Sequence, residues 1–208
     1  MTRVFRDISL WLIAILLVMA TLRFQVESTR AAADTITANL AVNATISIAC
    51  TDTVTMGAIT GTGQSALATN AATCTIITNN SGGYSLVWQA SAATMTDATA
   101  DTIAAYTPGT PNTPETWSVA GAASEWGGHL GSTSTTVNTT TWGAADTYAG
   151  GKWLNINNAA TFEIANRATE TTAGGDSEIT YFGAEVGASK FQPTGTYTVN
   201  VTMTATTQ

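Results

Sequence analysis

The chain has 208 residues and a formal net charge of −7, with only 10% charged residues against 44% hydrophobic ones. Soluble domains average about 25% charged residues, and seven Lys and Arg cannot supply the basic face that nucleic-acid binding requires. Two cysteines and one histidine are too few for zinc fingers or iron–sulfur folds. Low charge with high hydrophobicity also argues against disorder. The composition therefore favours a globular protein with a neutral surface.

The beginning of the sequence has the pattern of an export signal. Arg3 and Arg6 precede the apolar run Ile8–Leu22, and a basic start, a short apolar run and then small residues are typical of secretory signal peptides. Small residues allow cleavage after Ala33 or, as an alternative, after Ala20. An uncleaved N-terminal anchor is the other interpretation. In each case we expect a secreted or cell-surface protein that contacts the membrane only through this leader.

The sequence holds two cysteines, Cys50 and Cys74. In an exported domain an isolated pair predicts one disulfide, which closes a loop of about 24 residues and contributes roughly 3 kcal/mol of stability. The alternative is a redox-active pair, which usually needs close spacing such as Cys-x-x-Cys. We therefore expect a structural disulfide.

Apolar and mostly polar residues alternate without a slip from Ile36 to Cys50. Successive side chains of a strand point to opposite faces, so this pattern predicts an extended ribbon with one buried face. A second clear alternation near the other end of the sequence predicts the last strand. Its apolar residues are Tyr197, Val199, Val201 and Met203.

Weaker alternation predicts further strands between these two ends. The runs Thr73–Thr78 and Tyr84–Ala90 are separated by Asn79–Gly83, whose composition is typical of a hairpin turn. Thr-rich strands joined by Gly, Asn and Ser turns, without a convincing helical period, predict an all-β fold, an antiparallel β-sandwich. The later candidate strands are Thr116–Val119, Lys152–Ile156, Thr161–Arg167 and Ile179–Val186.

Residues 91–151 differ from the sequence around them. They are rich in Ala, Thr, Gly and Pro and show little alternation, so we expect long ordered loops and short strands inserted in the sandwich. Long loops are uncommon in compact domains and are often functional. The aromatic residues Trp117, Trp126 and Trp142 in this segment either cap the core or form stacking platforms for a ligand.

The ribbon that begins at Ile36 is too long for one ordinary strand, because strands average about 5–6 residues. One interpretation of this length is that the ribbon forms two consecutive strands or one bent strand. The other interpretation divides the chain into a leader (1–33), an N-terminal extension (34–43) and one sandwich domain (44–208). The extension would add itself to an open sheet edge of another subunit, with its alternate side chains filling a groove. Those side chains are Ile36, Ala38, Leu40 and Val42.

This arrangement resembles the secreted pilins of the chaperone–usher type and the related spore coat U-like proteins. The matching features are the leader, the alternating extension, and a cysteine in each of the first two strands, Cys50 and Cys74. In the closing segment Pro193–Thr202, Gly195 and Tyr197 match the Gly-x-aromatic start of the last strand. The resemblance implies an incomplete immunoglobulin-like sandwich that the extension of the next subunit completes. It also implies a secretion chaperone and an outer-membrane assembly protein as partners.

One residue could serve as a catalytic base. His129 is the single histidine, and Asp146 or Asp101 could be its partner in a Ser-His-Asp arrangement. No spacing supports either pair, and a solvated loop histidine is the simpler interpretation.

Acidic residues are the other candidates for chemistry. No spacing selects a pair for glycoside hydrolysis, and neither of two acidic clusters has the spaced pattern of a calcium loop. We therefore expect no enzyme activity, no cofactor and no metal site. The acids considered for hydrolysis are Glu115, Glu125, Glu163 and Glu170, and those considered for calcium are Asp97 with Asp101 and Asp176 with Glu178.

Two functions from different classes remain. The first is a structural subunit of an extracellular pilus or surface filament, which polymerises head-to-tail with copies of itself by N-terminal strand addition. The alternative is a monomeric surface adhesin or carbohydrate-binding sandwich that uses its Trp-bearing loops. A surface rich in Thr, Ala and Gly favours the filament, because copies then meet without burying charges.

Overall fold

The computed structural model describes residues 11–19, 34–51 and 53–208. The chain divides into two compact units, Met1–Ala41 and Val42–Gln208. In the first unit, residues 11–19 are helical, and residues 34–41 are exposed and have no regular secondary structure. Within these described ranges, no helix is both long and apolar enough to span a bilayer. The two expected cleavage points, after Ala20 and after Ala33, lie outside the described residues.

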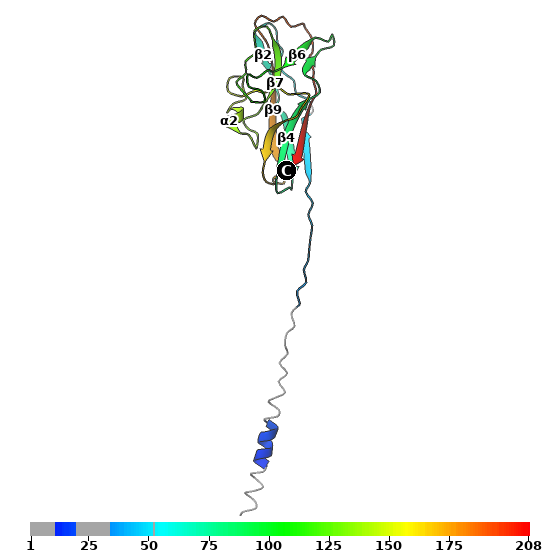
Figure 1. Cartoon of the computed structure of the whole chain (residues 1–208), viewed down its shortest axis with the longest axis vertical. Helices are drawn as coiled ribbons and strands as arrows, with labels where there is room; N and C mark the ends of the chain where they lie inside the picture. Colours follow the sequence, from blue (N-terminus) through cyan, green and yellow to red (C-terminus); the bar gives the residue numbers. More distant parts are fainter. Residues whose placement is uncertain (1–10, 20–33, 52) are drawn as a thin grey trace, which may run out of the picture. The chain divides into compact units, whose positions relative to one another are not determined.

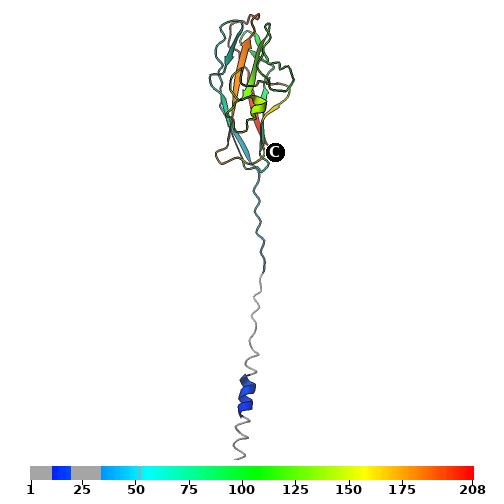
Figure 2. The ribbon, with the colours of Figure 1, turned by 90° about the vertical axis from the view of Figure 1, so that its left-hand side faces the viewer.

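The second unit is an all-β, sandwich-like domain, as the alternation predicts (Figure 1). A seven-stranded sheet has the order β1-β3-β9-β7-β6-β5, with β2 also paired to β9, and a three-stranded sheet has the order β10-β4-β8. Figure 2 shows the same domain turned by 90°. The elements are β1 (Ile46–Cys50), β2 (Gln64–Leu67), β3 (Ala72–Thr78), β4 (Tyr84–Ala90), β5 (Thr94–Thr96), β6 (Thr102–Ala105), β7 (Ser124–Leu130), α2 (Thr139–Trp142), β8 (Phe162–Arg167), β9 (Asp176–Val186) and β10 (Val201–Thr207).

The core lies between the sheets and follows the period-two pattern. On β4, Tyr84, Leu86 and Trp88 are 0% exposed, while the residues between them are half-buried. Strand β3 alternates in the same way and contributes Ile76. The predicted strands that correspond to β3, β4, β8 and β9 are therefore confirmed. The disulfide is confirmed too, because Cys50 and Cys74 are bonded and lie opposite each other in the β1–β3 ladder.

Strand β7 is the largest difference from the sequence prediction. All seven of its residues are buried, so it shows no alternation, and it pairs with β9 along its whole length. Gly127 and Gly128 allow this burial, because a Cβ on Gly127 would lie 2.8 Å from the Leu154 carbonyl oxygen and one on Gly128 would lie 2.7 Å from the Trp88 ring. The segment predicted as long loops and short strands does supply the short strands β5 and β6, but it also supplies the helix α2 and a central strand of the larger sheet.

Four other expectations are corrected. The turn Asn79–Gly83 is not a hairpin connection, because β3 and β4 belong to different sheets and the turn carries the chain from one sheet to the other. Residues 116–119 form no strand. Residues 152–156 form only isolated bridges, of Trp153 with Glu115 and of Leu154 with Gly128. The sandwich is also not wholly antiparallel, since β6 and β7 pair in parallel.

Candidate functional site: the seam between β1 and β10

The first and last strands of the domain, β1 and β10, are each the edge strand of one sheet. Among the described strands, β1 pairs only with β3, and β10 pairs only with β4. The two strands lie beside each other and contact across the edge of the sandwich (Figure 1). No ladder joins them in the described structure. The edges of the two sheets therefore meet at β1 and β10, and each of these strands has one edge that pairs with no other described strand.

The side chains along this edge are apolar and incompletely covered. Alternate residues, two on β1 and three on β10, pack against the main core yet are only half-buried, and the residues between them are exposed. Central strands differ, since Ile76, Leu86 and Trp88 are 0% exposed. We call the half-buried set the seam; it consists of Ile46, Ile48, Val201, Met203 and Ala205.

The extension has the complementary pattern. Its apolar side chains are exposed, with Ile36 at 91%, Leu40 at 89% and Val42 at 76%; Ala38 is exposed as well. A fully extended chain places these four alternate residues on one face. The region from Ile36 to Val42 is as long as β10, seven residues.

The last strand begins later than the sequence suggests. Tyr197 and Val199 precede β10, and only Val201 and Met203 of the predicted apolar face lie within it. Thr198 forms a bridge with Thr96 on β5. The ladder with β4 therefore starts at Val201, after the chain has crossed from the edge of the larger sheet to the smaller one.

The tyrosine of the closing segment has a local partner. The hydroxyl of Tyr197 donates to the Pro193 carbonyl oxygen at 2.8 Å and accepts from Nε2 of Gln192 at 2.8 Å. The residue fixes the turn that precedes β10. Its ring also packs, half-buried, against the main core.

The three tryptophans proposed as stacking platforms are buried. Trp126 on β7 is 1% exposed, Trp142 at the end of α2 is 3% and Trp117 is 9%. The Trp142 ring lies edge-on to Trp88 at 5.7 Å. Trp117 stacks on Tyr106 at 4.5 Å, in a second aromatic cluster. Since no ring face is open to a ligand, the structure gives no support to the binding-module alternative.

The histidine is engaged on both ring nitrogens and is 0% exposed. Nδ1 of His129 lies 3.0 Å from the Lys152 carbonyl oxygen, and Nε2 lies 3.2 Å from Oδ1 of Asp146. Asp101, the other suggested partner, instead bonds within a turn, to the Thr99 hydroxyl. His129 is therefore a core residue rather than a loop histidine, and no ring nitrogen is left to accept a substrate proton.

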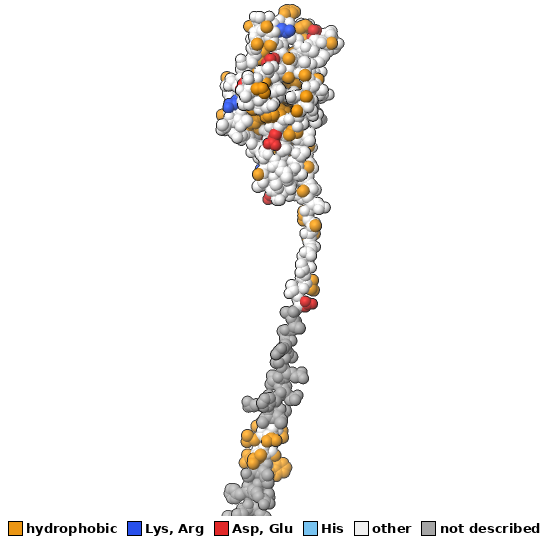
Figure 3. Space-filling view, in the orientation of Figure 1, with side chains coloured by type: hydrophobic (Ala, Val, Ile, Leu, Met, Phe, Trp, Pro, Cys, Tyr) orange, Lys and Arg blue, Asp and Glu red, His pale blue; other side chains and the backbone are white. Residues whose placement is uncertain are grey.

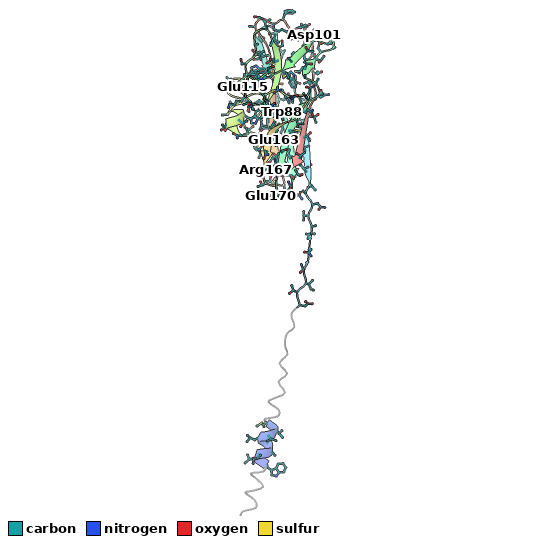
Figure 4. All side chains as sticks on the ribbon, in the orientation of Figure 1. Trp88, Asp101, Glu115, Glu163, Arg167 and Glu170 are labelled. Atoms are coloured by element: carbon teal, nitrogen blue, oxygen red, sulfur yellow. A yellow bond between two sulfur atoms is a disulfide. The ribbon has the colours of Figure 1, made fainter. Side chains whose placement is uncertain are left out.

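Three of the acids considered for hydrolysis do not converge on one point. Glu115, Glu163 and Glu170 lie at separate places on the domain (Figure 4). Within the described residues, no group of three or more His, Cys, Asp or Glu side chains could hold a metal ion. Charged side chains are also sparse on the face of the domain in Figure 3.

The structure also contains a polar cluster in the domain interior that the sequence analysis does not predict. The Tyr84 hydroxyl lies 2.9 Å from Oε1 of Glu178 and 3.1 Å from Oδ2 of Asp176. Arg167 pairs with Asp176 at 3.1 Å. Burial is the main cause that raises the pKa of the Glu178 carboxyl, and the charge of Asp176 adds to it. The cluster joins β4, β8 and β9 across the sandwich. In the sequence, the one indication of this cluster is that Asp176 and Glu178 occupy alternate positions that lead into the mostly apolar face of β9.

No protein-family model matches this chain, and the comparison with curated proteins found no match.

Proposed function

We propose that the protein is a structural subunit of an extracellular filament that polymerises head-to-tail by strand addition. The extension of one copy lies along the seam of the next, where its backbone pairs with a free strand edge and its alternate side chains cover the seam. The observation that carries this proposal is the pairing of features: a half-buried apolar seam on the domain and an exposed apolar face on the extension.

Length and chemistry support the match. The seven residues from Ile36 to Val42 equal β10 in length. Neither β1, β10 nor residues 35–42 contain a charged side chain, so their association buries no charge. Covering an apolar surface gains about 25 cal/mol for each Å² removed from water.

The geometry of repetition favours a filament. The extension and the seam are different surfaces of one chain, so the contact is heterologous, and such contacts form open filaments when the rotation does not close a ring. The disulfide fits an oxidising, extracellular location. A secretion chaperone that shields the seam before assembly is part of the same proposal.

The test places a charge on either face of the extension. Leu40→Asp puts a carboxylate on the apolar face and should abolish filaments, leaving secreted monomers. Asn39→Asp introduces the same charge one residue away, on the opposite face, and should assemble normally. Electron microscopy and size-exclusion chromatography of the exported protein measure both. Equal assembly by the two variants, or filaments after deletion of residues 34–42, would refute the proposal.

A further inference from the structure

The exposed side chain of Asn79 holds the start of the domain in an extended conformation. Its Oδ1 accepts from the backbone N–H of Thr45 at 2.7 Å and from the Thr45 hydroxyl at 3.2 Å. Its Nδ2 donates to the carbonyl oxygen of Asn43 at 3.0 Å. The neighbouring Thr78 hydroxyl donates to the Thr45 carbonyl oxygen at 2.7 Å. Four hydrogen bonds therefore fix residues 43–45, which lie in no strand.

These bonds replace a ladder that the backbone cannot continue. In the β1–β3 register, Ile46 lies opposite Thr78, so Thr45 would next lie opposite Asn79. The chain leaves β3 there and crosses to the other sheet. The Asn79 carboxamide accepts from the Thr45 N–H and donates to the carbonyl oxygen of Asn43, two residues earlier, so one side chain occupies two backbone groups on the same edge of this segment, as a neighbouring strand would. Residues 43–45 are thereby held as a continuation of β1.

This arrangement restricts where the extension can go. To reach the seam of its own domain, the extension has to reverse direction next to β1, and a tight reversal takes four residues. A turn at residues 42–45 breaks the bonds of Asn79. A turn before Asn43 uses up Leu40 and Val42 and leaves only Ile36 and Ala38 for the seam. While the bonds of Asn79 are intact, only two of the four apolar side chains of the extension can therefore reach the seam of its own domain.

We propose that Asn79 is a positioning residue that keeps the extension from closing on its own domain and so directs it to a second copy. This inference rests on the proposed function, because it assigns to Asn79 the choice between self-closure and assembly. Loss of the carboxamide frees residues 43–45 to turn, and the extension then competes intramolecularly for the seam. An intramolecular competitor has a high effective concentration, so monomers accumulate.

The chain offers a matched control. Asn70 is also exposed, its Oδ1 accepts from the Thr55 N–H at 3.1 Å, and its Nδ2 donates to the Thr53 carbonyl oxygen at 3.0 Å. Asn70→Ala thus removes the same pattern of bonds from a different segment. Asn79→Asp is an intermediate variant, because it keeps the acceptor for Thr45 and loses the donor to Asn43.

The experiment compares Asn79→Ala, Asn79→Asp, Asn70→Ala and the unchanged protein after export. We expect the ratio of monomer to filament to rise about tenfold in Asn79→Ala, the effect of losing the three hydrogen bonds of this exposed side chain. It should rise less in Asn79→Asp and stay within about twofold in Asn70→Ala. Assembly of Asn79→Ala equal to that of Asn70→Ala would overturn the inference.

Hydrogen exchange on the monomer fraction separates this inference from the proposed function. In Asn79→Ala the amides of residues 36–42 should become protected, and adding Leu40→Asp should remove the protection. Amides that exchange equally fast with and without Asn79 refute self-closure, even if filaments form by strand addition. Protected amides in Asn79→Ala monomers support it, even if the unchanged protein forms no filament and the proposed function fails.

Discussion

The buried His129 ring and the half-buried Asp146 side chain are hydrogen-bonded, with Nε2 and Oδ1 3.2 Å apart, and this contact ties the loop after α2 to the central strand β7. The other ring nitrogen faces the Lys152 carbonyl oxygen at 3.0 Å. The ring therefore has a polar partner at each of its two nitrogens. Asp146 also accepts the Ser132 N–H at 2.6 Å, which fixes its position.

Removing either member of this pair should destabilise the domain. We expect His129→Ala and Asp146→Ala each to cost about 1–3 kcal/mol, because each leaves polar atoms of the other side chain without their hydrogen-bond partner. The double variant should cost less than the sum of the two, since the second change removes the side chain that the first left without a partner. Urea unfolding measures all three, with the exposed Glu163→Ala as a control expected within about 0.5 kcal/mol of the unchanged protein. Strictly additive losses would contradict an interaction between the two side chains.

Gly128 on β7 should not tolerate a side chain. A Cβ there would lie 2.7 and 2.9 Å from two atoms of the Trp88 ring and 3.1 Å from Cδ1 of Ile156, and overpacking of this kind costs about 1–3 kcal/mol. We expect Gly128→Ala to lower the unfolding free energy by that amount. Gly174→Ala is the control, because its nearest neighbour, the Thr172 hydroxyl, is 4.0 Å away. Calorimetric melting temperatures compare the two, and equal melting would show that the ring moves aside freely.

Glu178 should make the domain less stable as pH rises above the acidic range. Burial raises the pKa of its carboxyl above the ordinary value of 4.5, so the folded protein keeps a proton that the unfolded chain has already lost. Stability therefore falls as pH increases from about 4.5 through the folded pKa, and is level above it.

Glu178→Gln tests this dependence directly. The amide keeps an acceptor for the Tyr84 hydroxyl and the Thr136 N–H, which both contact Oε1. It also adds a donor at the position of Oε2, which has no hydrogen-bond partner among the described atoms. We expect the variant to exceed the unchanged protein in stability at pH 7 and to match it near pH 4, in urea unfolding across that range. A variant that is less stable at pH 7 would show that the ionised carboxylate is needed.

The sequence predicts strands where one face is buried and the other is not. Strands β3 and β4 have this character, and alternation locates them within one residue. Strand β7 is covered on both faces, so its residues follow no period, and Gly127-Gly128 is more typical of a turn than of a strand. Turn composition also cannot tell a hairpin from a crossing between sheets, because Asn79–Gly83 reverses the chain in both cases.

The candidate site, too, can be predicted from the sequence only in part. Alternation from Ile36 to Cys50 predicts the exposed apolar face of the extension. The seam depends on which strands end the two sheets and lie together, and that follows from pairings of β1 and β10 with distant partners. Burial of the tryptophans likewise depends on tertiary packing, since Trp117 and Trp142 look the same in the sequence whether they cover the core or face a ligand.

Met203 at the middle of the seam offers a test of strand addition that does not require filaments. It lies opposite Trp88 in the β10–β4 ladder, is half-buried and packs on the core, so an added strand would cover it. Met203→Lys places an ammonium group there, whose burial without a partner is unfavourable. The next residue, Thr204, is exposed on the outer face, so Thr204→Lys adds the same charge outside the seam.

Binding of a synthetic peptide of residues 34–45 to a domain lacking residues 1–42 measures the effect. We expect Met203→Lys to weaken peptide binding by about tenfold or more, equivalent to at least about 1.4 kcal/mol, and Thr204→Lys to change it by less than about twofold. A peptide with Leu40→Asp should bind the unchanged domain as weakly as the original peptide binds Met203→Lys, because each change puts a charge into the same apolar contact. Equal binding by Met203→Lys and Thr204→Lys would mean that the extension pairs elsewhere, because only the seam distinguishes the two positions.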